Sequence, residues 1–134
     1  MRFLLDTNVV SEAAKPRPNA KCLNWLQAHS AASGYPSLAL AERYQGAFAL
    51  AEPERQAMLD ELQAVAAEAG ESLLPFDAKS AKAWGDYVNH PKVKSQPPGV
   101  IDSLIAAIAI ANGLTVATRD TDHFPEVDVI NPFD

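Results

Sequence analysis

The chain has 134 residues, of which 48% are hydrophobic and 21% charged, with a formal net charge of -6. This size and composition are typical of one soluble domain with a real core, spanning residues 1–134. The acidic balance excludes a protein that coats nucleic acid by charge alone, so any nucleic-acid substrate must be held locally, through bound cations. No apolar run is long enough to span a membrane and no signal-peptide pattern opens the chain, so we expect a cytoplasmic protein.

The first half of the chain predicts one strand followed by three helices. In chain order these are a strand over 2–5 and helices over 7–14, 19–30 and about 38–50. The prolines of "KPRP" indicate a loop after the first helix, and "SGYPS" is predicted to be a break. The single cysteine, Cys22, excludes an internal disulfide and a cysteine-based zinc finger, and we expect it to be a small buried residue.

The second half predicts helices that alternate with strands. An amphipathic helix starts at Pro53 and stops at Gly70, and a helix over 77–88 has Asp77 as its N-cap. The remaining segments are a strand in "SLLPF", a polar loop in "HPKVKSQPPG", a buried helix over 102–111 that ends at Gly113, and strands in "LTVAT" and "VDVI". Alternating strands and helices predict an α/β fold, with a parallel sheet covered by helices on both faces.

Four acidic residues stand beside strongly apolar sequence. Asp6 and Asp120 follow predicted strands, whose carboxyl ends form the usual ligand-binding edge of a parallel sheet. Asp102 opens the buried helix, and Glu42 lies on the helix after "SGYPS". Clustered carboxylates repel one another, and a hard divalent cation with oxygen ligands relieves that repulsion.

Each acid also has a simpler interpretation. Asp6 and Asp102 are at positions where Asp commonly caps a helix. Glu42 fits a solvated helix position, and Asp120 fits a turn. Only the joint placement of the four favours a metal site.

The same residues lie in motifs that resemble those of a known family. The motifs, in chain order, are "LLDTNVVSE", "LALAERYQG", "LLPFDAKSAKAWG", "IDSLIAAIAIANGLTVATRDTDHF" and "VINPF". Together they resemble the PIN domain of the VapC toxin type, which includes plasmid-stability and FitB-like proteins, over essentially the full length. The resemblance implies a single PIN domain with a three-layer α/β/α fold and a central parallel sheet of about four to five strands.

The sequence departs from the family pattern near two of the acids. Many relatives carry Ser and Thr where this chain has Pro36 and Ala39, which removes two hydroxyls near the site. Asp120 stands where relatives often have Asn, and His123 stands where they have a later Asp. Asp120 is therefore the expected fourth acid, with Asp122 as the alternative.

The resemblance implies a metal-dependent endoribonuclease that is the toxin of a type II toxin–antitoxin pair. Asp6 and Asp102 are the expected direct ligands of Mg²⁺ or Mn²⁺, and no other cofactor is expected. Glu42 and Asp120 are expected to bind the ion through water or to act as a base. Thr7 is expected to order the loop at Asp6, and Asn8 to hydrogen-bond the carboxylates or the RNA phosphate. The implied partners are a VapB-like antitoxin, RNA and a second copy of the chain.

Other polar and aromatic residues receive weaker assignments. His29 and His90 are predicted to be surface residues, and Trp25 and Trp84 to belong to the core. Four basic residues are candidates for contacts with RNA phosphates, although a solvated surface role is the favoured interpretation of the two lysines: Arg43, Lys92, Lys94 and Arg119.

Three alternative functions were compared with the sequence, which argues against the first two. A haloacid-dehalogenase-like phosphatase needs a second acid two residues after the first, where this chain has Asn8. A receiver-like phosphoacceptor needs paired acids after the first strand, and Asp6 stands alone there. A catalytically weak PIN scaffold that binds protein or RNA stays open because of Pro36 and Ala39.

Overall fold

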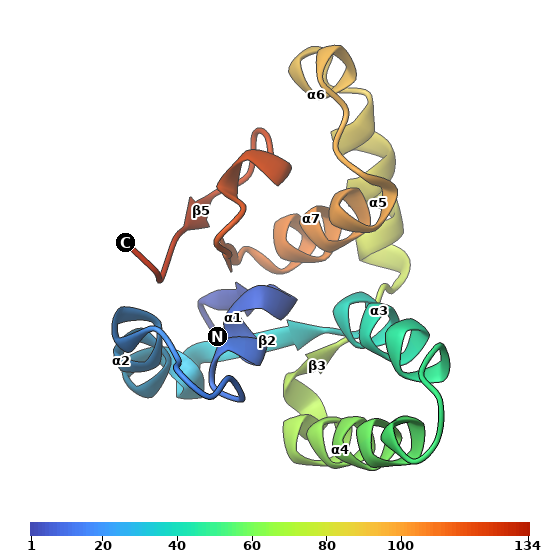
Figure 1. The fold of residues 1–134 in the computed structure, drawn as a ribbon. Helices are drawn as coiled ribbons and strands as arrows, with labels where there is room; N and C mark the ends of the chain where they lie inside the picture. The colour runs from blue at the N-terminus through green and yellow to red at the C-terminus, as the bar shows by residue number, and fades with distance from the viewer.

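The computed structural model describes residues 1–134, and its centre is a fully parallel five-stranded sheet (Figure 1). The strand order is β3-β2-β1-β4-β5, and every neighbouring pair is parallel. The strands are β1 (Phe3–Leu5), β2 (Ser33–Pro36), β3 (Leu73–Leu74), β4 (Thr115–Ala117) and β5 (Val129–Ile130). The predicted parallel sheet of four to five strands is confirmed.

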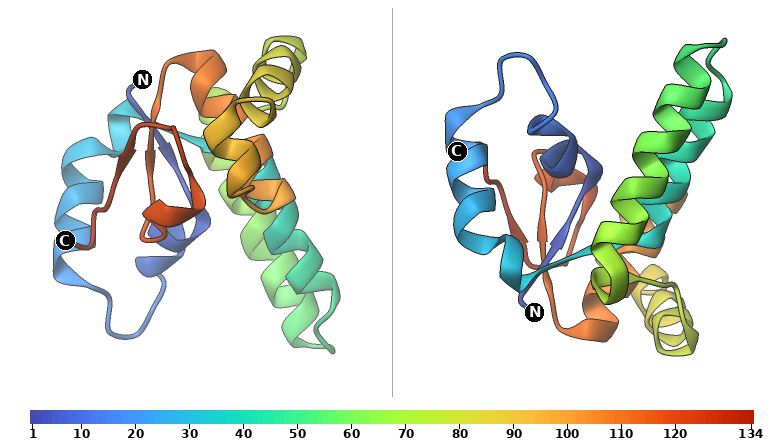
Figure 2. Two further views of the ribbon diagram at one scale, coloured as in Figure 1. Left: turned by 90° about the horizontal axis from the view of Figure 1, so that it is seen from above. Right: turned by 90° about the horizontal axis from the view of Figure 1, so that it is seen from below.

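Helices cover both faces of this sheet, as expected for a three-layer fold. In Figure 2, α2 lies on one side of the strands, and α3, α5 and α7 lie on the other. The helices are α1 (Thr7–Glu12), α2 (Ala20–His29), α3 (Ser37–Phe48), α4 (Glu54–Ala69), α5 (Ala78–Val88), α6 (Pro91–Ser95) and α7 (Val100–Asn112). Three short 3₁₀ turns, η1 (Ser30–Ala32), η2 (Gly70–Ser72) and η3 (Thr121–His123), complete the chain.

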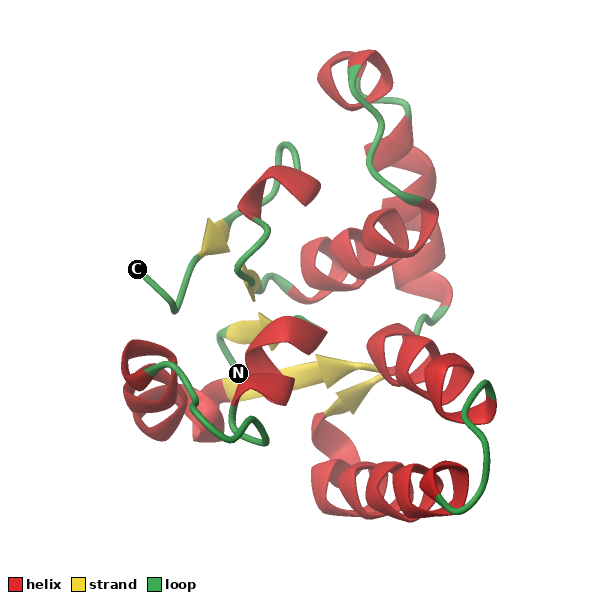
Figure 3. Ribbon diagram, in the orientation of Figure 1, coloured by secondary structure: helices red, strands yellow, loops and turns green.

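The predicted break at "SGYPS" is wrong, because residues 33–36 form strand β2 (Figure 3). Gly and Pro suggested a turn, yet all four residues of the strand are buried. A Cβ at Gly34 would lie only 3.2 Å from the Ser72 carbonyl oxygen and from Leu74 Cδ1, so glycine suits the close packing here. Pro36 is the last residue of the strand and lies beyond the Ser33 and Gly34 pairings with β1, so its missing N–H leaves the β1–β2 ladder intact.

The predicted loop "HPKVKSQPPG" is also partly wrong, because it contains the short helix α6. His90 caps this helix through Nδ1, which accepts a hydrogen bond from the Lys92 N–H at 3.2 Å. Pro91 occupies the first turn, where its missing N–H costs nothing, and Val93 is buried against the core. Local capping and one apolar anchor therefore make a helix in a segment whose composition suggests a loop.

Most other predicted elements are confirmed, with ends that shift by a few residues. Asp77 caps α5 by accepting from the Ser80 N–H, and Gly113 ends α7 with a left-handed φ of 65°. Cys22 is fully buried, as expected. His29 is not a free surface residue, because its ring lies 4.7 Å from the Trp25 ring and 5.1 Å from the Phe3 ring. No helix is both long and apolar enough to cross a bilayer.

Candidate active site

A cavity of about 460 Å³ opens at the carboxyl ends of β1 and β4. Asp6 follows β1 directly, and its N–H donates to the Ala117 carbonyl of β4 at 2.9 Å, which joins the two strand ends. Every residue that lines the cavity is polar: Asp6, Thr7, Asn8, Ser11, Glu42, Asp102, Asp120 and His123. The four acids predicted to converge thus line one cavity, although they come from distant parts of the sequence.

Asp6 is buried, and its two carboxylate oxygens have different hydrogen-bond partners. Its Oδ1 accepts from the Thr7 N–H at 2.9 Å and so caps α1, as the simpler interpretation predicted. Its Oδ2 accepts from the Thr118 hydroxyl at 2.9 Å and from the Asn8 amide at 3.4 Å. The cap therefore accounts for one oxygen only, and the second is oriented by side chains around the cavity.

Thr118, a residue that the sequence analysis did not single out, connects the two strand ends. Its fully buried hydroxyl donates to Asp6 and accepts from the Asp120 N–H at 3.0 Å. The Asn8 amide donates to Asp120 Oδ2 at 3.1 Å and to the Thr118 hydroxyl at 3.3 Å. Thr118 looked like an ordinary β-branched strand residue, and the available signal was its place two residues before Asp120 in the same motif.

Glu42 and Asp102 are the two acids of the cavity whose pKa values are raised. Burial and the neighbouring charges of Asp102 and Asp6 raise the pKa of Glu42. Burial and the charges of Asp6 and Asp120 also raise the pKa of Asp102, although His123 opposes this shift. The His123 Nδ1 lies 3.4 Å from Asp102 Oδ2. Burial and the neighbouring acids therefore destabilise the charged forms of Glu42 and Asp102, and a bound cation would relieve this.

The chemistry of the donor set fits a hard divalent cation, since all four acids offer oxygen. The side chains are not arranged as a finished coordination sphere, because no group of three or more His, Cys, Asp or Glu residues is placed to hold one ion. Hydrogen bonds instead direct Asp6 Oδ2 toward Asn8 and Thr118, and Asp120 Oδ2 toward Asn8. Asp102 is not a helix cap, because Gly99 takes that position and Asp102 lies in the first turn of α7.

Several other predicted residues lie outside this cavity. Asp122 lines a neighbouring cavity, whose lining also includes Asp102 and His123. Asp120, and not Asp122, lines the four-acid cavity. Pro36 precedes α3 and gives it no side-chain cap, as expected from the missing hydroxyl. Lys92 Nζ lies 3.8 Å from Glu126 Oε1 and so forms an ion pair away from the four-acid cavity.

The fold and the cavity define a class of protein: a three-layer α/β/α domain with an acidic site at the carboxyl edge of its parallel sheet. The profile of the PIN domain family matches residues 3–130. The chain belongs to the PIN domain family.

Curated and solved relatives span nearly the whole chain. It is 35% identical to the VapC ribonuclease Y4jK of Sinorhizobium fredii and 34% identical to the toxin FitB of Neisseria gonorrhoeae, with 98% of both chains covered in each case. The crystal structure of FitAcB from Neisseria gonorrhoeae superposes with a TM-score of 0.84 at 32% identity, covering 98% of both chains. VapBC2 from Rickettsia felis, solved with a promoter DNA fragment, superposes with a TM-score of 0.74 at 26% identity and the same coverage.

Proposed function

We propose that this protein is a metal-dependent endoribonuclease and the toxin of a type II toxin–antitoxin system. The observation that supports this most is the single cavity lined by Asp6, Glu42, Asp102 and Asp120, two of which have raised pKa values. The similarity to a protein named as a VapC ribonuclease points to the same chemistry. The proposed substrate is an RNA phosphodiester bond, and the proposed compartment is the cytoplasm.

Asp6 and Asp102 are the proposed direct ligands of Mg²⁺ or Mn²⁺, with Glu42 and Asp120 holding the ion through water. A bound divalent cation supplies acidified water and neutralises charge, so that a phosphate can enter an acidic cavity. Thr118 and Asn8 hold Asp6 in position by hydrogen bonds. As the alternative to holding the ion through water, Glu42, which lines the same cavity, is the proposed base that removes a proton from the attacking water.

The proposed protein partner is a VapB-like antitoxin, since relatives are solved as FitAB and VapBC complexes. A groove of about 360 Å³ lies between α1 and α4 and has apolar walls that include Val10, Tyr35 and Val65. An amphipathic antitoxin helix places its apolar side in such a groove. We further propose that a basic antitoxin side chain reaches the acids, and that the toxin forms a homodimer.

A catalytically weak PIN scaffold is the second candidate. It is favoured by one observation, namely that the acidic side chains do not form a group placed to hold one ion. In that case the acidic cavity serves binding of a partner only, and the protein neither binds Mn²⁺ nor cleaves RNA.

The deciding experiment incubates the purified protein with defined RNAs and either Mg²⁺ or Mn²⁺, with and without a chelator, alongside calorimetric titration with Mn²⁺. The proposed function predicts Mn²⁺ binding and cleavage that the chelator abolishes. Cleavage that persists in chelator contradicts the metal requirement. Absence of both binding at millimolar Mn²⁺ and cleavage supports the scaffold.

A further inference from the structure

Glu12, the last residue of α1, is a buried carboxylate that the proposed reaction does not use. Only 3% of its surface is exposed. Burying a carboxylate is costly unless it is paired, and an acid at a helix C-terminus also meets the negative end of the helix dipole. Some other part of the molecule must therefore compensate this charge.

Three groups surround the Glu12 carboxylate. Its Oε2 accepts from the Asn19 N–H at 2.9 Å, and its Oε1 lies 3.0 Å from Lys15 Nζ and 3.8 Å from Arg119 Nη2. The backbone hydrogen bond from Asn19 and the positive charges, Lys15 foremost, lower the pKa of Glu12. Glu12 is therefore ionised at neutral pH and offers a fixed negative charge to Arg119.

Arg119 links this buried charge to the acidic cavity. Its guanidinium Cζ lies 3.8 Å from the centre of the Phe133 ring, so Glu12 and Phe133 both contact the same cation. Its backbone N–H donates to Asn8 Oδ1 at 3.1 Å, and the next residue, Asp120, accepts from the Asn8 amide. The Arg119 side chain is thus anchored on one side while its backbone forms part of the site.

We propose that Glu12 and Arg119 are positioning residues, whose ion pair holds the turn after β4 so that Asp120 and Asn8 face the acidic cavity. Neither residue lines that cavity, so neither touches the ion or the reacting atoms. The inference rests on the proposed function for its effect on RNA cleavage. It competes with the interpretation that the half-exposed Arg119 side chain binds RNA phosphates, and the KM of Arg119→Gln distinguishes the two.

The test compares Glu12→Gln, Arg119→Gln and the double variant. In Glu12→Gln, the new side chain keeps an oxygen that accepts from the Asn19 N–H but loses the negative charge that pairs with Arg119. Each single variant is expected to lose roughly 10-fold in Mn²⁺ affinity by calorimetry without RNA, as for other residues that orient metal ligands. The turnover number kcat falls by a similar factor while KM stays constant. The double variant is expected to lose no more than either single one, since all three break the same link.

Lys15→Gln is the matched control, because it removes a different cation from the same Glu12 oxygen without touching the turn after β4. It is expected to bind Mn²⁺ and cleave RNA like the wild type. An equal loss in Lys15→Gln overturns the inference, and so does a higher KM confined to Arg119→Gln, which assigns Arg119 to RNA binding. If Glu12→Gln fails to fold, Arg119→Gln, whose side chain is 47% exposed, carries the test.

One readout is independent of the proposed function. In the metal-free protein, the side-chain amide resonance of Asn8 is expected to shift in Glu12→Gln and Arg119→Gln, and to stay unchanged in Lys15→Gln. Variants with wild-type resonances and wild-type Mn²⁺ affinity overturn this inference alone. A wild-type protein that neither binds Mn²⁺ nor cleaves RNA overturns the proposed function, whatever the resonances show.

Discussion

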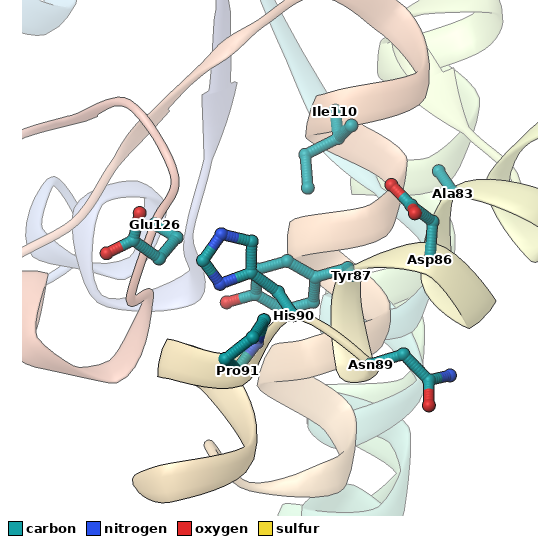
Figure 4. Close-up of a pocket in the computed structure, with 8 residues that line it drawn as sticks. All are labelled: Ala83, Asp86, Tyr87, Asn89, His90, Pro91, Ile110 and Glu126. Atoms are coloured by element: carbon teal, nitrogen blue, oxygen red, sulfur yellow. The ribbon is translucent and has the colours of Figure 1, made fainter.

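Two cavities of nearly equal volume differ in what their polar groups are doing. The cavity between α5, α6 and α7 measures about 470 Å³ and includes Tyr87, His90 and Glu126 in its lining (Figure 4). There, the Tyr87 hydroxyl donates to the Pro125 carbonyl at 2.6 Å, and His90 caps α6. In the acidic cavity, at about 460 Å³, burial and neighbouring carboxylates raise the pKa of Glu42 and of Asp102.

Cavity volume therefore does not distinguish the candidate active site from the helical cavity in this protein. In the helical cavity, burial raises the pKa of Tyr87 to about 12, so its hydroxyl stays protonated and serves as a donor to Pro125. The Tyr87 hydroxyl and His90 Nδ1 are thus paired within the fold. In the acidic cavity, burial and like-charge repulsion act on Glu42 and Asp102, His123 offsets them only in part at Asp102, and a bound cation would relieve them.

The strongest test of this contrast is Asp6→Asn. We expect RNA cleavage to fall by at least about 100-fold, because residues that merely orient metal ligands already contribute 10- to 100-fold. The fold should remain intact, since Asn also caps helices well. Cleavage rates and circular-dichroism melting curves check both parts. Glu126→Gln, in the helical cavity, is the control and should cleave normally; a wild-type rate in Asp6→Asn removes Asp6 from the mechanism.

A smaller effect is expected on stability as the pH changes. Asp102 has a raised pKa in the folded state, so its contribution to stability is full below its ordinary value of 3.8 and is lost as the pH rises through the folded value. In the metal-free protein, the Tm of Asp102→Asn relative to that of the wild type should therefore rise by roughly 2 °C between pH 4 and 7.

Saturating Mn²⁺ should reverse that order, since an ion that binds only the folded wild type stabilises it. Thermal melts at several pH values, with and without Mn²⁺, measure both effects. A Tm difference that stays constant with pH would show that repulsion at Asp102 is not relieved by protonation.

The smallest expected effect belongs to the helical cavity. Tyr87→Phe removes the hydrogen bond to Pro125 and should lower the free energy of unfolding by about 1 kcal/mol, as measured by urea denaturation. Cleavage of RNA should be unchanged. Lost cleavage in a stably folded Tyr87→Phe protein would mean that the two cavities are not functionally separate.

The sequence by itself determined the features that depend on neighbouring residues. The cap at Asp77, the stop at Gly113 and the buried helix α7 follow from spacing and residue type. The convergence of Asp6 and Asp120 also followed, because parallel strands place their carboxyl ends at one edge.

Only the tertiary structure decided the features that depend on partners far along the chain. Strand β2 is made by pairing with β1 and β3, which overrides the turn preference of Gly34 and Pro36. The hydroxyl of Thr118 and the charge of Glu12 acquire roles only when β4 lies beside β1 and α1. The physical reason is that periodicity and capping are local, whereas a buried polar group must find its partner wherever the fold brings one.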